Sequence, residues 1–555
     1  MMSKDHFSPD PQLNRLLEKV VAEVRLFAEK QLRHIHKRVE IGIALSAEKD
    51  VNKIFEMIVD EAKVITGADG GTLYIVDERE QFLNFVILHN DSLKIKLGGT
   101  SGKKIDLPPV PLKKNGKPNH THVSAYAALT GKVVNIPDVY QAEGFDFTGP
   151  REYDKRTGYR SKSMLVIPMR NHENDTIGVL QLLNARDRNS NEVVPFKAEQ
   201  MDFVKSLAYQ AAVALENAQL FQELKKLFES FIKSIATTID EKSPYTGGHI
   251  RRVVDLTMLI ANEICRTADG PFAGTQLSPD EMEELRIATW MHDIGKITTP
   301  EHVVDKATKL EGVFDRIHLI DLRFNLIQTA AENEFLKKRL KLLENGNPDS
   351  RALQQLEEEF NEKIKTLQME KAFVLKCNQP AEKMSEDKLD LLERIARKTY
   401  MVNGQPRPYL TPDELRNLSI MRGTLTPEER KIIENHALMT IKILNQLPFP
   451  KKLANVPEYA GGHHERLDGS GYPFGLTKSK LPLQARIMAV ADIFESLTAK
   501  DRPYKRPMKL SQALEILKKM KDDQHIDADI YDLFVGRKLY KKYADRELNP
   551  EQVDL

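Results

Sequence analysis

Cysteine is scarce in this chain, with two, Cys265 and Cys377, among 555 residues. They form no CxxC pair, which excludes a disulfide framework and favours a reducing compartment. No apolar run approaches the length of about 18 residues that a membrane-spanning helix needs. The first residues, MMSKDHFSPDPQ, lack the apolar core of a signal peptide. We therefore expect a cytoplasmic protein that does not insert into a membrane.

An excess of charge is also missing, because 82 basic residues are balanced by 81 acidic residues. Proteins that coat a nucleic-acid polymer carry a clear positive excess, since they bind mainly through the phosphates. No nucleic-acid polymer is therefore expected as a partner. At roughly 100–200 residues per domain, the length predicts about three structural units.

What the sequence does contain is pairs of adjacent histidines and acids. His292 and Asp293 begin the segment HDIGK, and His463 and His464 begin HHERLDGSGYP far downstream. Such pairs are costly to bury unless a cation binds them, and imidazole with carboxylate suits a divalent transition metal. Because a carboxylate has two oxygens, Asp293 can bridge two ions. Two ions about 3.5–4 Å apart form the usual clamp for in-line phosphoryl displacement.

The order HDxGK followed by HHExxDGxGYP resembles the HD-GYP phosphodiesterases, which hydrolyse cyclic dinucleotides, chiefly cyclic di-GMP. The segments TGGHIRRV (246–253) and LTPEERKIIENH (425–436) are similar to two further motifs of that family. The resemblance implies two divalent ions, iron or manganese, with a third ion disfavoured because Tyr245 replaces its carboxylate. The implied ligands are His249, His292, Asp293 and Asp492 for one ion, and Asp293, His436, His463 and His464 for the other.

The resemblance also implies the chemical roles. Asp293 and Lys296 are the implied catalytic residues, with a metal-activated hydroxide as the nucleophile and Lys296 on the scissile phosphate. Residues 290–294 are expected to form a helical turn that places His292 and Asp293 at the site. The other implied substrate-binding residues lie in the GYP loop and in the segment RPYK: Gly471, Tyr472, Pro473, Arg502 and Lys505. Packing of its own loop is an equal alternative for Tyr472.

The expected reaction is hydrolysis of cyclic di-GMP to linear pGpG, with further cleavage to GMP left open. Another cyclic dinucleotide, such as 3',3'-cGAMP, is an alternative substrate, because the motifs do not mark residues that read the bases. A different class, a non-catalytic receptor or scaffold for cyclic dinucleotides, is the second alternative. The intact metal and phosphate residues argue against it.

An α+β pattern precedes these motifs. A helix is predicted over 51–65 and strands over 70–76, 82–88, 165–169 and 177–183. This order resembles a GAF domain, and residues 144–169 are especially similar to the GAF domains of cyclic-nucleotide phosphodiesterases. Nucleotide-binding GAF domains often carry an Asn-Lys pair, but here Ala185 follows Asn184. The resemblance therefore implies the fold and leaves two roles open, a small-molecule sensor or a ligand-free dimerisation module.

Two further helical segments are predicted. Ala214, Phe221, Phe228 and Ile235 recur every seven residues, a seam suited to a parallel coiled coil between two copies. We expect a homodimer through this connecting helix, with packing on its own domain as the alternative. Apolar stripes on both sides of the turn NGNPDS predict an antiparallel helical hairpin inside the catalytic domain. That insertion is a candidate cap over the site or a docking site for a protein partner.

The predicted fold class is therefore multidomain: an α+β GAF sensor domain, a connecting coiled-coil helix, and an all-α HD-GYP domain with a helical-hairpin insertion. The GAF domain is expected to regulate the catalytic domain. The expected boundaries are 1–44 for an N-terminal helix, 45–200 for the GAF domain, 201–235 for the connecting helix, 236–545 for the HD-GYP domain and 311–422 for its insertion.

Overall fold

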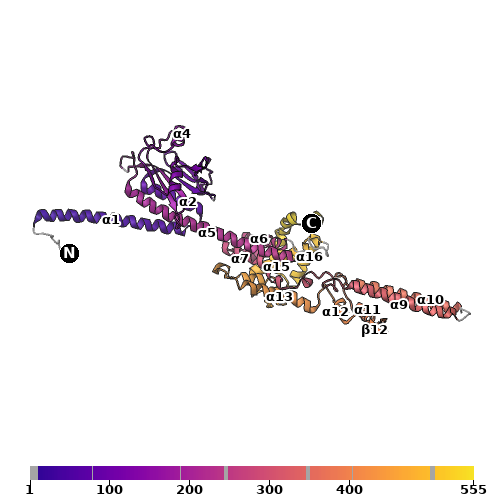
Figure 1. Cartoon of the computed structure of the whole chain (residues 1–555). Coiled ribbons are helices and arrows are strands. Elements are labelled where there is room, and N and C mark those ends of the chain that lie inside the picture. Colours follow the sequence, from indigo (N-terminus) through magenta and orange to yellow (C-terminus); the bar gives the residue numbers. More distant parts are fainter. Residues whose placement is uncertain are drawn as a thin grey trace. The chain divides into compact units, whose positions relative to one another are not determined.

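The computed structural model describes residues 10–77, 79–187, 189–242, 248–344, 350–402, 404–500 and 507–555. The chain divides into two compact units, Met1–Leu227 and Phe228–Leu555. Helix α5 (Ala198–Lys242) begins in the first unit and ends in the second (Figure 1). Among the described residues, no helix combines the length and the hydropathy that crossing a membrane requires.

The first unit is built on an antiparallel sheet. The strand order is β3-β2-β1-β9-β8-β7, with β4 added to β2 and β10 added to β9. A separate small hairpin pairs β5 with β6. The bounds are β1 (Ala68–Val76), β2 (Phe82–Asn90), β3 (Ile95–Gly98), β4 (Val110–Pro111), β5 (Lys113–Lys114), β6 (Lys117–Pro118), β7 (Val134–Ile136), β8 (Met164–Arg170), β9 (Thr176–Arg186) and β10 (Val193–Val194).

Both faces of this sheet are apolar and covered. Leu73 and Leu180 belong to a core that includes residues of α1, α2 and α5, whereas Tyr74 and Val179 belong to a second core with residues of α3. Successive residues of a strand point to opposite faces, which explains the nearly continuous burial of β1 and β8. The helices of this unit besides α5 are α1 (Pro11–Ala47), α2 (Val51–Thr66), α3 (Val123–Thr130) and α4 (Thr148–Thr157).

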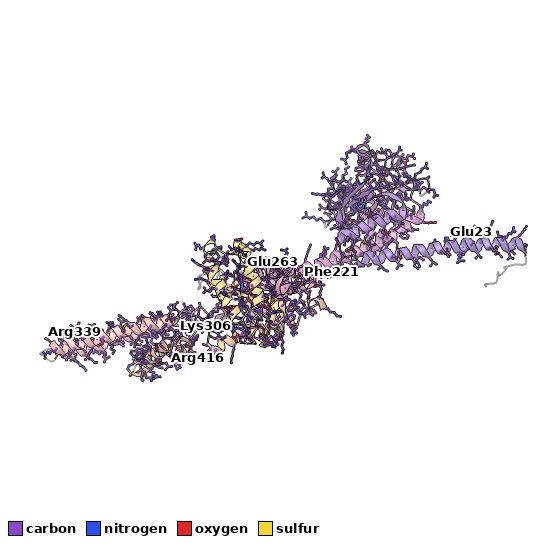
Figure 2. All side chains as sticks on the ribbon, turned by 180° about the vertical axis from the view of Figure 1, so that it is seen from behind. Glu23, Phe221, Glu263, Lys306, Arg339 and Arg416 are labelled. Carbon is purple, nitrogen blue, oxygen red and sulfur yellow. The ribbon has the colours of Figure 1, made fainter. Side chains whose placement is uncertain are left out.

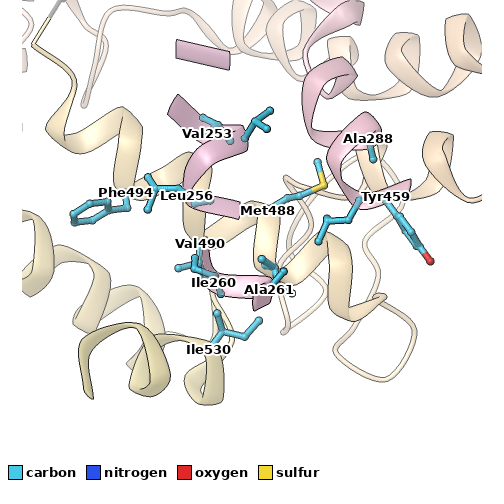
Figure 3. Close-up of a cluster of buried hydrophobic side chains, with 14 of the residues drawn as sticks. Val253, Leu256, Ile260, Ala261, Ala288, Tyr459, Met488, Val490, Phe494 and Ile530 are labelled. Atoms are coloured by element: carbon cyan, nitrogen blue, oxygen red, sulfur yellow. The ribbon is translucent and has the colours of Figure 1, made fainter. Parts of the chain in front are cut away.

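The second unit is helical around one large core. Figure 3 shows Val253, Leu256 and Ile260 of α6 near Val490 and Phe494 of α15. The helices of this core and its rim are α6 (His249–Arg266), α7 (Pro279–Met291), α8 (Glu301–Val304), α13 (Pro427–Leu444), α14 (Val456–Gly461), α15 (Leu483–Thr498), α16 (Leu510–Asp522), α17 (Ala528–Gly536) and α18 (Leu539–Glu547). The predicted fold class, an α+β domain followed by a helical domain, is confirmed.

The predicted hairpin is present as α9 (Ile317–Glu344) and α10 (Ser350–Cys377), which lie side by side (Figure 1). Most of its predicted turn lies outside the described residues. Lys306 lies near the base of the hairpin and Arg339 far along it (Figure 2). The chain then adds elements that the sequence analysis did not predict: α11 (Glu386–Ala396), β11 (Thr399–Val402), β12 (Gln405–Pro408) and α12 (Pro412–Leu418).

The insertion has a core of its own and a polar anchor. Phe324 of α9, Val374 of α10 and Leu392 of α11 are buried together. At the base, Lys306 Nζ lies 2.8 Å from a Glu429 oxygen and 3.0 Å from Asn417 Oδ1 of α12. Lys306 therefore ties the segment before the insertion to the segment after it and to the insertion itself.

Candidate metal centre and active site

The HDIGK segment is held by a tight contact with α13, the helix that carries His436. Thr440 Oγ1 donates to the His292 carbonyl and accepts from the Gly295 amide, each at 3.0 Å. A Cβ on Gly295 would lie 1.9 Å from the His436 carbonyl oxygen, so only glycine allows this approach. Helix α7 ends at Met291 and His292 is its C-cap. Asp293 therefore lies outside the helical turn predicted for residues 290–294, in the turn before the 3₁₀ segment Ile294–Thr298.

Two histidines face one oxygen of Asp293, and Asp492 faces the same two histidines. Asp293 Oδ2 lies 3.8 Å from His249 Nε2 and 3.4 Å from His292 Nε2. Asp492 Oδ1 approaches the same two nitrogens, at 3.3 Å and 3.9 Å. His249, His292 and Asp293 are buried, and their donor atoms all lie within 4.8 Å of one another. These four residues are the set predicted for the first ion.

Three histidines gather on the other side of Asp293. One ring nitrogen each of His436, His463 and His464 lies within 4.8 Å of the other two. His436 Nε2 lies 3.4 Å from Asp293 Oδ1, the oxygen that is not directed at the first group. The two oxygens of Asp293 thus face two separate clusters of imidazoles, which is the arrangement that a bridging carboxylate needs.

The second nitrogen of each buried imidazole is held by a neighbour. His292, His436 and His463 direct Nδ1 at the backbone carbonyl three residues earlier: Thr289, Ile433 and Ala460. A carbonyl only accepts, so Nδ1 carries the proton and Nε2 presents its lone pair to the centre. His249 Nδ1 instead contacts Glu495, which also accepts from Arg252 Nε at 2.7 Å.

Four buried atoms at the centre have no hydrogen-bond partner within the part of the chain that the structure describes. They are His292 Nε2, Asp293 Oδ1, His436 Nε2 and His463 Nε2. Leaving one buried polar atom unsatisfied costs about 1–3 kcal/mol, so four in one place need a ligand. Neutral imidazoles and a carboxylate are the donor set of a divalent transition metal. The residues present therefore fit a metal centre.

The electrostatics of the second cluster agree with metal ligation. Burial and the neighbouring His292 lower the pKa of His463 to about 3. Burial and His463 likewise hold the pKa of His464 well below its usual value. Both rings are therefore neutral near pH 7, as metal ligands must be.

The first cluster holds more charge. Burial opposes ionisation of Asp293, but the charges of Lys296 and His292 outweigh it and keep its pKa well below the usual value. Burial also opposes protonation of His249, but Glu495 and Asp492 raise the pKa of His249 to about 10.

Both the side chain and the backbone carbonyl of Lys296 are held by hydrogen bonds. Its Nζ lies 2.5 Å from Asp293 Oδ2. Its carbonyl, with those of Ile297 and Thr299, accepts from Lys242 Nζ at 3.1, 2.8 and 2.8 Å. Lys242 is the last residue of α5, so the end of the connecting helix holds the segment that carries Lys296.

The GYP loop is closely packed against the second cluster. The Tyr472 ring lies 4.8 Å from the His464 ring, centre to centre. The buried carboxylate of Glu465 accepts from the amides of Phe474 and Leu476 at 2.7 and 2.8 Å. A Cβ on Gly471 would lie 2.3 Å from the Arg466 nitrogen, so glycine is required there. Tyr472 thus packs against the site, and Pro473 follows it through a cis peptide bond.

Three residues named in the sequence analysis lie outside the described part of the chain: Tyr245, Arg502 and Lys505. The structure also places at the site three residues that the sequence analysis did not name: Asp240, Lys242 and Glu495. Glu495 could have been found, because it is a second acid three residues after Asp492 on an apolar helix. Burial raises the pKa of Asp240, a carboxyl near His249, to about 6.

Several cavities are large enough for a small molecule, and two of them bear on the proposed sites. One, of about 660 Å³, is open beside the centre and lined by Lys242, Glu301, Asp305 and Glu311 among others. Three of these residues, Lys242, Glu301 and Asp305, also line a small pocket that contains His249, Asp293 and Lys296. The other of the two, also about 660 Å³, lies in the first unit, with the rings of Tyr74, Phe85, Tyr153 and Tyr159 in its wall.

Fold and site together define an α+β domain followed by a helical domain whose buried histidines and acids fit a metal centre. A GAF domain model matches residues 50–215, and two HD domain models match residues 246–369 and 409–530. The chain therefore contains a GAF domain and an HD domain, as the sequence predicts.

Several relatives of this chain are named as cyclic-dinucleotide phosphodiesterases. The chain is 37% identical over 146 residues to a probable cyclic di-GMP phosphodiesterase of Vibrio cholerae. The matched residues make up 24% of this chain and 32% of that protein. It is 37% identical over 125 residues to 3'3'-cGAMP-specific phosphodiesterase 1 of the same organism, 22% of this chain and 27% of that protein. It is 44% identical over 91 residues to the cyclic di-GMP phosphodiesterase of Thermotoga maritima, 16% of this chain and 24% of that protein. The matches thus span at most 32% of these relatives' own lengths.

Proposed function

We propose that the HD domain of this chain is a metal-dependent phosphodiesterase that opens cyclic di-GMP to linear pGpG. The observation that carries the proposal is the position of Asp293, whose two oxygens face two clusters of histidines. The names of the relatives support a cyclic dinucleotide as the substrate. Since one relative is named for 3'3'-cGAMP, that ring is the second candidate substrate.

The proposed ligands divide as the two clusters do. His249, His292, Asp293 and Asp492 would hold one ion, and Asp293, His436, His463 and His464 would hold the other. When bound, such a pair supplies a nucleophilic hydroxide near neutral pH and neutralises charge on the phosphoryl oxygens.

The remaining roles belong to side chains of this chain. Lys296 places a fixed positive charge at the centre, where the scissile phosphate has to approach. Tyr472 and its loop border the second cluster and limit the space for the sugar and base. The open cavity beside Lys242 has room for part of the substrate. Arg502 and Lys505 are proposed to bind the phosphates on the strength of the sequence motif alone.

Regulation by the GAF domain is proposed to act through α5. The aromatic cavity of the first unit suits a small planar ligand, and α5 is continuous from that unit to Lys242. Because Lys242 holds three carbonyls of the Lys296 segment, a shift or rotation of α5 would move Lys296 relative to Asp293.

The same helix is proposed to form a homodimer. Phe221 of the predicted seam is 56% exposed, and Leu224 and Phe231, which lie between its seven-residue repeats, are 64% and 56% exposed. Ala214, by contrast, is buried in the core of the first unit. Ile235 packs against the core of the second unit. The two ends of the seam thus pack within their own units, whereas the exposed residues in the middle of the seam are proposed to pair with a second copy.

The first prediction tests the reaction. Protein purified without oxygen should contain bound iron or manganese and hydrolyse cyclic di-GMP, measured by metal analysis and by chromatography of the products. Asp293→Ala should lower turnover by at least about a thousandfold, because it removes a ligand from both ion sites. Comparison with 3'3'-cGAMP under the same conditions decides between the two rings. Unchanged turnover in the variant, or tight binding without turnover in the metal-loaded wild type, would contradict the proposed activity.

The second prediction tests the contact at the end of α5. Lys242→Met should lower kcat by about tenfold or more while metal content stays unchanged, since loss of well-placed positioning contacts has effects of this size. Lys226→Met changes an exposed lysine of the same helix and should leave kcat unchanged. Equal kcat in the two variants would show that Lys242 does not position Lys296.

A further inference from the structure

Helix α9 has two apolar faces, and its own hairpin covers one of them. Ile320, Phe324, Ile327 and Ala331 are buried, and the Phe335 ring stacks on Phe360 of α10 with 4.4 Å between centres. The other face carries six leucines that are between 45% and 64% exposed. They are Leu319, Leu322, Leu326, Leu336, Leu340 and Leu343.

The exposed leucines follow the spacing of a coiled coil. Steps of three and four residues alternate without interruption from Leu319 to Leu343, which is the repeat of positions a and d in a heptad. Only two places in this series are polar, and both residues are exposed: Thr329 at a d position and Asn333 at an a position. A single asparagine at an a position typically fixes the register and the number of helices in a coiled coil.

We propose that α9 pairs in parallel with α9 of a second copy of this chain. The seam is then self-complementary, since each leucine meets the same leucine of the partner and Asn333 meets Asn333 of the partner subunit. In this arrangement α10 stays on the outer side of each α9, so the hairpin keeps its own buried face.

The charges beside the seam favour the parallel arrangement. In a parallel pair, each g position faces the e position five residues later in the partner. Glu332 then faces Lys337 of the partner subunit, and Arg339 faces Glu344 of the partner subunit, so both charged contacts are attractive.

An antiparallel pair with the leucines in register reverses the sign of the charged contacts. In that register Leu319 faces Leu343 of the partner subunit, so the numbers of two facing residues add up to about 662. Glu332 then lies next to Glu332 of the partner subunit. This contact joins like charges, so charge complementarity selects the parallel pair with a second copy as the occupant of this face.

The geometry is tested by cross-linking in the full-length chain. With Leu343→Cys, a short bis-maleimide, which reacts with two thiols, should join position 343 to position 343 of the partner, identified by peptide mapping. The unmodified chain, with its native Cys265 and Cys377, gives the background. A cross-link absent at 343 would overturn the proposal. So would one that requires Leu319→Cys together with Leu343→Cys, because only an antiparallel pair places these positions together.

The driving force of the α9 pairing is tested in the chain that carries Leu343→Cys. Leu336→Gln with Leu340→Gln should lower the cross-linking yield at least about tenfold, because apolar burial drives the pairing. Met369→Gln, at an exposed residue of α10, should not lower it. Glu332→Lys should lower the yield, and Glu332→Lys with Lys337→Glu should restore it. Circular dichroism checks that helix content is unchanged, and a yield indifferent to these substitutions would overturn the proposal.

Measuring the mass of the assembly distinguishes self-association through α5 from self-association through α9. In the full-length chain with Phe221→Gln and Leu224→Gln, sedimentation should still show self-association through α9. Adding Leu336→Gln and Leu340→Gln should leave monomers. Monomers already in the first variant would overturn the proposal, since they would assign all association to α5.

Discussion

At the scale of single residues, the site depends on side chains that do not face the proposed ions. His249 differs from His292, His436 and His463 because a carboxylate, rather than a carbonyl, holds its Nδ1. That carboxylate, Glu495, is fully buried and also pairs with Arg252. One charge thus orients a proposed ligand and satisfies a buried guanidinium at the same time.

The third prediction concerns this residue. Glu495→Gln should weaken metal binding by about 10–100-fold, the usual effect of removing a partner that orients a ligand. The amide has one acceptor oxygen, whereas the carboxylate now serves His249 and Arg252 with two. Metal titration followed by turnover measures the effect. Glu515→Gln, on the exposed part of α16, is the matched control, and equal metal affinity in both variants would contradict the assigned role.

At the scale of elements, the insertion is a small folded body held by buried ion pairs. Arg323 of α9 contacts Glu414 of α12 through both guanidinium nitrogens, at 2.7 and 3.0 Å. The Glu414 side chain is 5% exposed and that of Arg323 is 16% exposed. This contact fixes α12 against the hairpin, because both partners are nearly withdrawn from water.

The fourth prediction concerns this pair. Burial opposes ionisation of Glu414, but Arg323 outweighs it and lowers the pKa of Glu414 below its ordinary value of 4.5. Its stabilising contribution is therefore complete above about pH 4.5 and is lost as the pH falls through the lower pKa of the folded state. Glu414→Gln should cost up to about 3 kcal/mol at pH 7 and remove this pH dependence.

Hydrogen exchange of α9 and α12 measures the effect of that substitution. Glu393→Gln disrupts an exposed pair with Arg397 in the same insertion and should cost less than about 1 kcal/mol. Equal protection in the two variants would show that the buried pair does not stabilise the insertion.

The sequence predicted the elements whose pattern is local. Strands β1, β2, β8 and β9 and the hairpin could be read from apolar spacing, since each is long enough to show a buried stripe. The shorter strands of the first unit were not predicted. Lys242 could not be predicted, because its three acceptors lie 54 to 57 residues away and any lysine at a helix end looks the same. Helices α11 and α12 were missed because they are short and their burial depends on α9 and α10. The site residues were predicted through a motif, whereas their supporting contacts cross between elements.

At the scale of the whole molecule, the chain has separate cores connected by one helix. The cores of the first unit draw on residues before 219, and the main core of the second unit begins at Ile232. All the proposed metal ligands belong to the second unit. Stabilisation by a bound ion therefore acts directly on that unit alone.

The fifth prediction follows from this division. Heating the full-length chain should show at least two transitions, and iron or manganese should raise only the one that belongs to Phe228–Leu555. A ligand at 100 times its Kd adds about 2.7 kcal/mol to the unit that binds it. Calorimetry with and without a chelator measures the shift, and hydrogen exchange assigns each transition to a unit. In Asp293→Ala the chelator should shift neither transition, which serves as the control. One transition that moves as a whole with metal would instead mean that α5 couples the two units into one cooperative body, and regulation would then act through stability as well as through Lys242.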